Sequence, residues 1–285
     1  MSDTTLRKPE LRETELREPT GTFGTLASYM MRLQIKSVLV WGGVLGLYAA
    51  AIVASYLSFG DPTQMEQIMS AYPPELLEAF GITDMSTIEG FLAGQIFNLI
   101  PLAIAFFPIL ALSAAIAGSE ERGTIDVLLG NPIPRWQLVV GSFVATAVSL
   151  LIIVAIMGGI MYGTSLLIDI ELDFAASVEG VLNLWPISVF FGSLALLCSA
   201  IFHRRALAIA VPGFVLLAMY LADTLGRVSE DFEAYRDFSV FYYYAPDGSA
   251  ITDGIDWASF FGVSGVAILF ALLAVAVFRR RDIYT

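Results

Sequence analysis

The chain has 285 residues, of which 57 % are hydrophobic and only 15 % are charged. A soluble protein of this length must cover its surface with polar groups, and this composition supplies too few of them, so a water-soluble globular enzyme is excluded. The mean hydropathy is +0.74, and the apolar residues come in long blocks that are typical of membrane-spanning helices. The alternating ten-residue strands of a membrane β-barrel are not found in the sequence.

The segment before the first apolar block divides into two parts. In residues 1–21 a Leu-Arg pair recurs every five residues, a spacing that fits neither one helix face nor a strand, so we expect a disordered cytoplasmic tail. Residues 22–36 carry apolar residues at helical spacing near Arg32 and Lys36, which predicts an amphipathic helix on the inner membrane surface. The alternative is a cytoplasmic extension of the first span.

Six apolar blocks predict an all-α integral membrane protein with six transmembrane helices in a membrane domain of residues 37–285. The predicted spans are residues 38–59, 93–117, 138–168, 181–202, 206–222 and 257–278. None of them contains Asp, Glu, Lys, Arg or His. The third is longer than the roughly 20 residues that a bilayer needs, so we expect it to tilt or protrude. The fifth is the weakest, because it is short and contains Pro212.

The basic residues predict how the spans are oriented. With six spans, every Lys and Arg except Arg227 and Arg236 falls on one side of the membrane. Basic residues stay in the cytoplasm, so both termini are predicted to be cytoplasmic and the protein to lie in the plasma membrane. The acidic residues, which give the chain its net charge of −12, are concentrated in the three outer segments. We favour an acidic surface suited to high salt over recruitment of cationic solutes, because the acids are spread over all three segments.

Two of the outer segments carry apolar patterns of their own. Residues 60–92 predict short amphipathic helices broken at the Pro73-Pro74 pair. The last outer segment, 223–256, contains four consecutive aromatic residues at 241–244. Such a cluster is usually an interfacial anchor, and a re-entrant segment over 241–251 is the alternative.

Several kinds of chemistry are missing from the sequence. The only Lys followed by Ser or Thr is Lys36, and a P-loop ending there would need glycines where Met30 and Ile35 stand. With one His, His203, and one Cys, Cys198, the chain has no His/Cys metal cluster. We therefore expect no metal, cofactor or ATP site in this chain. The uncharged spans disfavour a proton-coupled transporter, so the energy for uphill transport is expected to come from a partner chain.

The connection between the second and third predicted spans is the exception among short inner loops. Ser119 can cap a helix whose positive N-terminal end suits Glu120 and Glu121. Further along, Ile125, Leu128 and Leu129 form one apolar face, and the Gly-Asn-Pro sequence at 130–132 ends the helix. Two interpretations are open. The apolar face lies against the membrane and the other spans, or it docks into a groove on a cytoplasmic partner.

This loop resembles the coupling loop of ABC-2 type transporter permeases. The resemblance rests on Glu121-Arg-Gly-Thr-Ile-Asp-Val-Leu-Leu129, on Pro132, Pro134, Arg135 and Gly141 after it, and on the basic tail at 279–281. The loop would comprise Glu120, Glu121, Arg122, Gly123, Thr124, Ile125, Asp126, Leu128, Leu129, Pro132, Pro134 and Arg135. For Gly123 a simple turn, and for Arg135 a positive-inside anchor, remain the alternatives.

The resemblance implies a division of labour between chains. Two permease chains, identical or homologous, would pair in the lipid bilayer to form the pathway. Separate cytoplasmic ABC ATPase subunits would bind ATP and Mg²⁺, and the loop would carry their motion to the membrane. Transport would usually be export, and no nucleic-acid partner is expected. In such permeases an amphipathic helix precedes the first span and a partly re-entrant element follows the fifth.

Two other functions are compatible with the sequence. A membrane scaffold or assembly protein would use the same loop to recruit a different cytoplasmic factor. A membrane-embedded enzyme would need polar catalytic groups at depth, where Gln95 and Asn98 are the only candidates and are better explained by hydrogen bonds between helices. The polar residues that would face a pathway or a neighbouring helix are Gln95, Asn98, Thr146, Ser149 and Asn183. None of them identifies a substrate.

Overall fold

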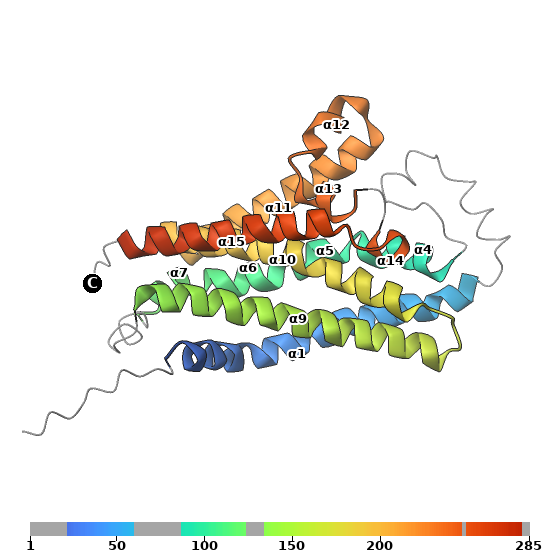
Figure 1. Cartoon of the computed structure of the whole chain (residues 1–285), viewed down its shortest axis with the longest axis horizontal. Helices are drawn as coiled ribbons and strands as arrows, with labels where there is room; N and C mark the ends of the chain where they lie inside the picture. The colour runs from blue at the N-terminus through green and yellow to red at the C-terminus, as the bar shows by residue number, and fades with distance from the viewer. Residues whose placement is uncertain (1–21, 60–86, 124–133, 247–248, 281–285) are drawn as a thin grey trace, which may run out of the picture.

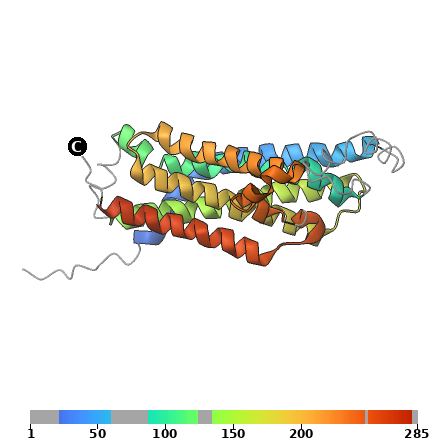
Figure 2. The same ribbon diagram turned by 90° about the horizontal axis from the view of Figure 1, so that it is seen from above.

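The protein forms an elongated bundle of helices (Figure 1). The structure is a computed structural model that describes residues 22–59, 87–123, 134–246 and 249–280. These residues are helical apart from short connections and contain no strand. Seen from above, the long helices again lie along one common direction (Figure 2). The predicted all-α fold is confirmed.

Six helical segments are long and apolar enough to cross a membrane. They are Leu26–Tyr56, Ile88–Ser113, Arg135–Leu167, Phe174–Ile201, Arg205–Val228 and Trp257–Arg280. Large apolar side chains on the outside of the bundle stay exposed, for example Leu47 at 68 % and Phe214 at 74 %. A lipid environment removes the cost of exposing them, so the six predicted spans are confirmed.

The helix of the first span begins before the predicted start of the span at residue 38. Helix α1 runs without a break from Thr22 to Tyr56, so no boundary separates residues 22–36 from the span. This is the continuous arrangement that was the alternative interpretation. In Figure 1 the first turns of α1 are seen more nearly end-on than the rest, so the helix bends near its beginning. A position of these turns on the membrane surface stays a prediction.

Helix α1 packs along α9 (Arg135–Leu167) through two glycines one turn apart. A Cβ atom on Gly42 would lie 3.0 Å from Cβ of Ile156, and one on Gly46 would lie 2.5 Å from Cδ1 of Ile160. This spacing of small residues is the pattern that lets two membrane helices approach closely. The contacts advance together along both helices, so α1 and α9 run parallel.

The second span is irregular. It consists of α4 (Ile88–Leu92), a π-helix η2 (Ala93–Phe97), α5 (Ile100–Ile104) and α6 (Phe106–Ser113). Three tyrosine hydroxyls donate hydrogen bonds around η2: Tyr48 to the Gln95 carbonyl oxygen, Tyr244 to that of Phe97, and Tyr220 to Oδ1 of Asn98. Prolines at 101 and 108 remove further backbone donors.

The most enclosed span is α10 (Phe174–Ile201), which contacts α6, α9, α11 and α15. Asp173 caps its first turn by accepting a hydrogen bond from the Ala175 backbone N–H at 3.1 Å. The last span, α15 (Trp257–Arg280), is capped by Asp256 in the same way. The hydrogen bonds from Ser259 and from the Ala258 N–H lower the pKa of Asp256 below its ordinary value.

The fifth span, α11 (Arg205–Val228), continues past the predicted end at residue 222. Asp223 and Arg227 therefore lie in the same helix as the predicted span, and the predicted end of the membrane-spanning part at residue 222 stays a prediction. Asp223 is 6 % exposed and pairs with two arginines, accepting from Nε of Arg227 at 3.0 Å and from Nε of Arg236 at 3.3 Å. These bonds neutralise the buried charge, so the helix need not end before it.

After α11 the chain forms α12 (Glu230–Arg236) and then turns back onto the bundle in α13 (Val240–Tyr244) and α14 (Ala250–Asp253). Phe241 and Ile251 are buried, and Nδ2 of Asn183 on α10 donates to the Tyr244 carbonyl oxygen at 2.7 Å. The aromatic segment is thus packed between spans. Its depth in a bilayer stays a prediction.

The start of α1, the starts of α9 and α11 and the end of α15 lie at one end of the bundle (Figure 1). We call this the loop end. The described basic residues that belong to it are Arg32, Lys36, Arg122, Arg135, Arg204, Arg205, Arg279 and Arg280. Arg227 and Arg236 belong instead to the end of α11 and to α12, which lie away from the loop end. The arrangement brings together the residues that the positive-inside rule assigns to the cytoplasm.

Candidate functional site

The predicted coupling loop begins in a short helix at the loop end, α7 (Ala117–Glu121). Gly123 has φ +66, a left-handed conformation that glycine adopts without strain and that commonly follows the end of a helix. The expected helix from Ser119 to Leu129 is therefore wrong in its first part. Ser119 does not cap it but lies inside α7, where its hydroxyl donates to the Ala114 carbonyl oxygen at 3.1 Å.

Ser199 on α10 forms two hydrogen bonds to the junction between α6 and α7. Its hydroxyl accepts a hydrogen bond from the Ala117 backbone N–H at 2.9 Å and donates to the Ser113 carbonyl oxygen at 3.1 Å. Both backbone groups belong to the break between the two helices, where regular helical bonds are missing. Ser199 is fully buried, so these bonds fix the break to the most enclosed span.

Glu121 connects α7 to the fifth span. Its Oε1 accepts a hydrogen bond of 2.8 Å from the backbone N–H of Arg205, the first residue of α11. A carboxylate is favourable there, because the first N–H groups of a helix are unsatisfied and carry the positive end of its dipole. The side chain of Arg205 in turn passes over Gly118, where a Cβ would lie 3.0 Å from its Cδ. Glu121, which the sequence predicted as a coupling residue, thus contacts the first turn of a span that begins 84 residues further along the chain.

The remaining loop residues fall into two groups. Thr124, Ile125, Asp126, Leu128, Leu129 and Pro132 lie outside the described residues. Pro134 and Arg135 begin α9, and the Pro134 carbonyl oxygen accepts a hydrogen bond from the Gln137 N–H at 2.9 Å. Contact of any of these residues with an ATPase stays a prediction.

Three of the five polar residues predicted inside the spans make hydrogen bonds between segments of the bundle. Asn98 accepts from Tyr220, Thr146 accepts from Nε2 of Gln34 at 3.1 Å, and Asn183 donates to the Tyr244 carbonyl oxygen. Ser149 is fully buried, and its hydroxyl has no hydrogen-bond partner in the described part of the chain. At Gln95 the backbone carbonyl receives the Tyr48 hydroxyl. A role for these residues along a pathway stays a prediction.

Ser199 and Arg205 were not predicted as site residues. A serine in an apolar helix signals a hydrogen bond to a neighbouring helix, but its partner 86 residues away is not visible in the sequence. The contact of Glu121 uses only the backbone of Arg205, which leaves no residue-type signal. Within the described ranges, no group of three His, Cys, Asp or Glu could hold a metal ion.

A comparison with known families decides the assignment. The model of the ABC-2 family of transporter proteins matches residues 30–283, nearly the whole chain. The chain belongs to the ABC-2 transporter family. This ABC-2 protein is therefore a multi-pass membrane protein and a transporter permease. No curated protein sequence matches the chain, so the family model carries the assignment.

The Ser199 contact of this ABC-2 permease can be tested by removing one oxygen atom. We expect Ser199→Ala to lower the free energy of unfolding by about 1–2 kcal/mol, because it leaves a buried N–H and a buried carbonyl unpaired. Thermal unfolding of the purified protein in a neutral detergent measures the loss. Ser188→Ala is the matched control, since the Ser188 hydroxyl donates to Leu184 of the same helix. Equal losses for both variants would show that the hydrogen bonds from Ser199 to the junction of α6 and α7 stabilise the protein no more than a hydrogen bond within one helix does.

Proposed function

We propose that this chain is the transmembrane subunit of an ABC transporter and forms a solute pathway, most simply for export. A separate cytoplasmic ATPase subunit binds ATP and Mg²⁺ and supplies the energy, and a second permease copy or homologue completes the pathway in the plasma membrane. The observation that carries the proposal is the attachment of α7, at the start of the loop, to two different spans.

A force applied to the loop reaches both spans through these attachments. The Ser199 bonds transmit it to α10, and the Glu121 carboxylate transmits it to the first turn of α11. The second span itself is irregular at η2, and the turn at 114–116 separates it from α7, so α7 can shift without carrying a long rigid helix with it. Movement of α11 then acts on the packed segment α13, which it contacts.

The orientation supports the same arrangement. The basic residues gathered at the loop end predict that this end faces the cytoplasm, where an ATPase subunit has access to α7. Large apolar side chains on the outer faces of the spans are exposed, so a second permease copy has an apolar surface on which to pack.

The experiment is a co-purification followed by an activity measurement. The tagged chain is purified from its native cell in nanodiscs, and the ATPase activity that co-elutes is measured while solutes are screened for stimulation. We expect a P-loop ATPase to co-elute, and we expect Glu121→Ala to reduce stimulated hydrolysis by about tenfold or more, as the loss of one charge-assisted hydrogen bond predicts. Glu121→Gln keeps an acceptor oxygen and should retain part of the stimulation.

Glu171→Gln is the control, because Glu171 is an exposed carboxylate in the connection between α9 and α10, at the opposite end of the bundle. All variants are checked for unchanged membrane insertion and for retention of the ATPase. Full stimulation in Glu121→Ala would remove the coupling role. Co-elution of a different cytoplasmic factor without an ATPase would favour the scaffold function instead. Uptake into inside-out vesicles supports export, and uptake into right-side-out vesicles contradicts it.

A further inference from the structure

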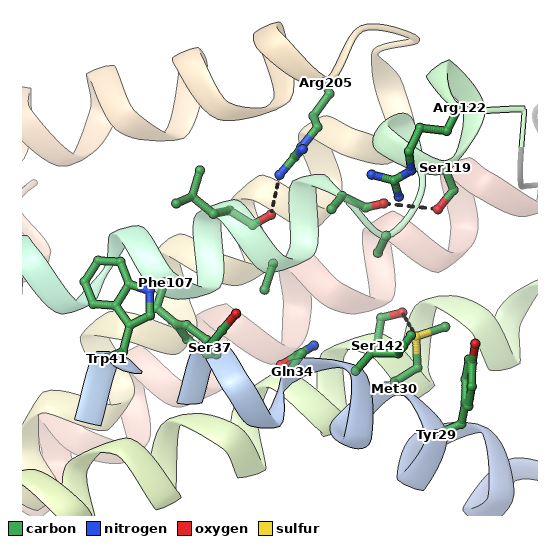
Figure 3. A pocket seen from close by; sticks show the side chains of 15 residues that line it. Tyr29, Met30, Gln34, Ser37, Trp41, Phe107, Ser119, Arg122, Ser142 and Arg205 are labelled. Atoms are coloured by element: carbon green, nitrogen blue, oxygen red, sulfur yellow. Dashed lines mark hydrogen bonds between the residues drawn. The ribbon is translucent and has the colours of Figure 1, made fainter. Parts of the chain in front are cut away.

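A cavity of about 630 Å³ opens at the loop end between α1, α6, α7, α9 and the start of α11. Its size falls in the roughly 300–1,000 Å³ range of sites for small ligands. Figure 3 shows the side chains that line it, with Trp41 and Phe107 at one end, Arg122 toward the other, and Arg205 reaching in from the start of α11 on the same side as Arg122. The cavity is therefore amphipathic along its length.

The charged end is cationic. Arg122 and Arg205 line it, and no carboxylate is among the described residues of the lining. The Glu121 carboxylate on α7 accepts a hydrogen bond from the Arg205 backbone N–H. Arg205 donates through one terminal nitrogen to the Leu110 carbonyl oxygen at 3.4 Å, while its Nε is buried and has no acceptor among the described residues. A buried donor without a partner is costly and points to an acceptor supplied by a ligand.

The middle of the cavity holds a second unpaired polar atom. The Gln34 amide nitrogen donates to Thr146, but its Oε1 is buried without a donor in the described part of the chain. Ser142, another lining residue, donates its hydroxyl to the Leu138 carbonyl oxygen of its own helix. Gln34 Oε1 can accept from a hydroxyl group of a ligand that lies between the arginines and the apolar end.

The other end of the cavity is apolar. The rings of Trp41 and Phe107 pack in an edge-to-face arrangement, with their centroids 6.3 Å apart. Leu33 also lines the cavity and is 62 % exposed. Along α1 the lining extends from Tyr29, which is 51 % exposed, to Trp41, about three turns of helix further on. This length suits a hydrocarbon chain that enters beside a headgroup at the membrane surface.

We propose that this cavity binds an anionic amphiphile of the cytoplasmic leaflet: a phosphate-bearing headgroup between Arg122 and Arg205, a hydroxyl at Gln34, and one acyl chain against Trp41 and Phe107. Basic pockets between membrane helices on this side bind anionic headgroups. Binding does not require an ATPase, so its failure and the failure of the proposed transport function are distinguishable.

The test is equilibrium binding of radiolabelled lysophosphatidylglycerol to the purified chain in a neutral maltoside detergent. We expect saturable binding of one molecule per chain. The double variant Arg122→Gln/Arg205→Gln should weaken it by about tenfold or more, the effect of losing charge-assisted hydrogen bonds. Ala111→Phe, which adds a large side chain to the lining, should also weaken it. Arg204→Gln is the matched control, since Arg204 is an exposed neighbour that does not line the cavity.

Three outcomes overturn the proposal. Equal binding of lysophosphatidylcholine shows an apolar groove without charge selection. Competition by glycerol phosphate at equal concentration shows a site for a free phosphate compound rather than for a lipid. An equal loss in Arg204→Gln shows attraction to surface charge alone. Variants that elute differently from the wild type on gel filtration are replaced by Arg205→Lys, which keeps the charge and should retain partial binding.

Discussion

Replacing Asp223 with alanine is expected to lower the free energy of unfolding by about 3 kcal/mol, the effect of breaking a buried ion pair by removing one partner. Asp223 lies near the end of α11 and is the shared acceptor of Arg227 and Arg236. Without it, two arginines whose side chains are only 19 % exposed lose their counter-charge. Thermal unfolding in detergent measures the effect.

The same variant should loosen one part of the molecule before the rest. Arg227 also donates to the Ala245 carbonyl oxygen at 3.3 Å, and the Arg236 guanidinium lies 5.1 Å from the centre of the Tyr242 ring. The cluster thus fixes α12 and the aromatic segment to the end of α11. We expect trypsin to cleave after Arg236 faster in Asp223→Ala than in the wild type.

Asp231→Ala is the control for this prediction, because Asp231 is exposed on α12. It should leave both the unfolding temperature and the cleavage rate unchanged. Asp223→Asn keeps an acceptor oxygen and should fall between the wild type and the alanine variant. If Asp223→Ala and Asp231→Ala behave alike, the three charges do not hold this end of the bundle together.

The second large effect is expected in the contact between α1 and α9. Gly46→Leu should destabilise the protein by about 2–3 kcal/mol, because the new side chain has to occupy the space of Ile160. Thermal unfolding of the purified protein measures the loss. Gly43→Leu is a control on the same helix, since a Cβ on Gly43 meets no atom within 4 Å.

A compensating change sharpens the test. Shortening the neighbour in the double variant Gly46→Ala/Ile160→Ala should cost less than the sum of the two single variants, because the added methyl group fills part of the space that Ile160 vacates. Additive losses would show that the two positions are not in contact. Both glycine variants gain helix propensity, so a stabilising Gly43→Leu is consistent with the contact and only a destabilising one counts against it.

The sequence predicted the spans well, because in lipid a long apolar block has few alternatives to a helix. It placed the end of the fifth span at residue 222, whereas helix α11 continues to Val228. Asp223 looked like the first residue of an outer loop, and its two arginine partners, one of them 13 residues away, became visible only in three dimensions. The sequence also divided residues 22–36 from the first span, because these turns are amphipathic. In the structure they continue α1 and pack on α9, where Leu26 lies beside Gly141.

At the candidate site the sequence identified Glu121 but not what it touches. The carboxylate meets a backbone N–H, a group that every residue except proline carries, so no pattern in the sequence points to Arg205. The helix expected at 119–129 was predicted from the apolar spacing of Ile125 and Leu128. The prediction took no account of Gly123. This glycine has a left-handed conformation that follows the end of α7, before Ile125 and Leu128 in the chain.

The π-helix in the second span has a geometric consequence for the whole span. A π-turn contains one residue more than an α-turn, and a single residue rotates the following helix by about 100°. The two halves of the span are therefore out of phase, and one helical wheel drawn through all 26 residues from Ile88 to Ser113 mixes two different faces. On one side of η2, α4 meets α1 and α14; on the other, α6 meets α10 and α11. One extra residue lets a single span present a separate face to each set of neighbours.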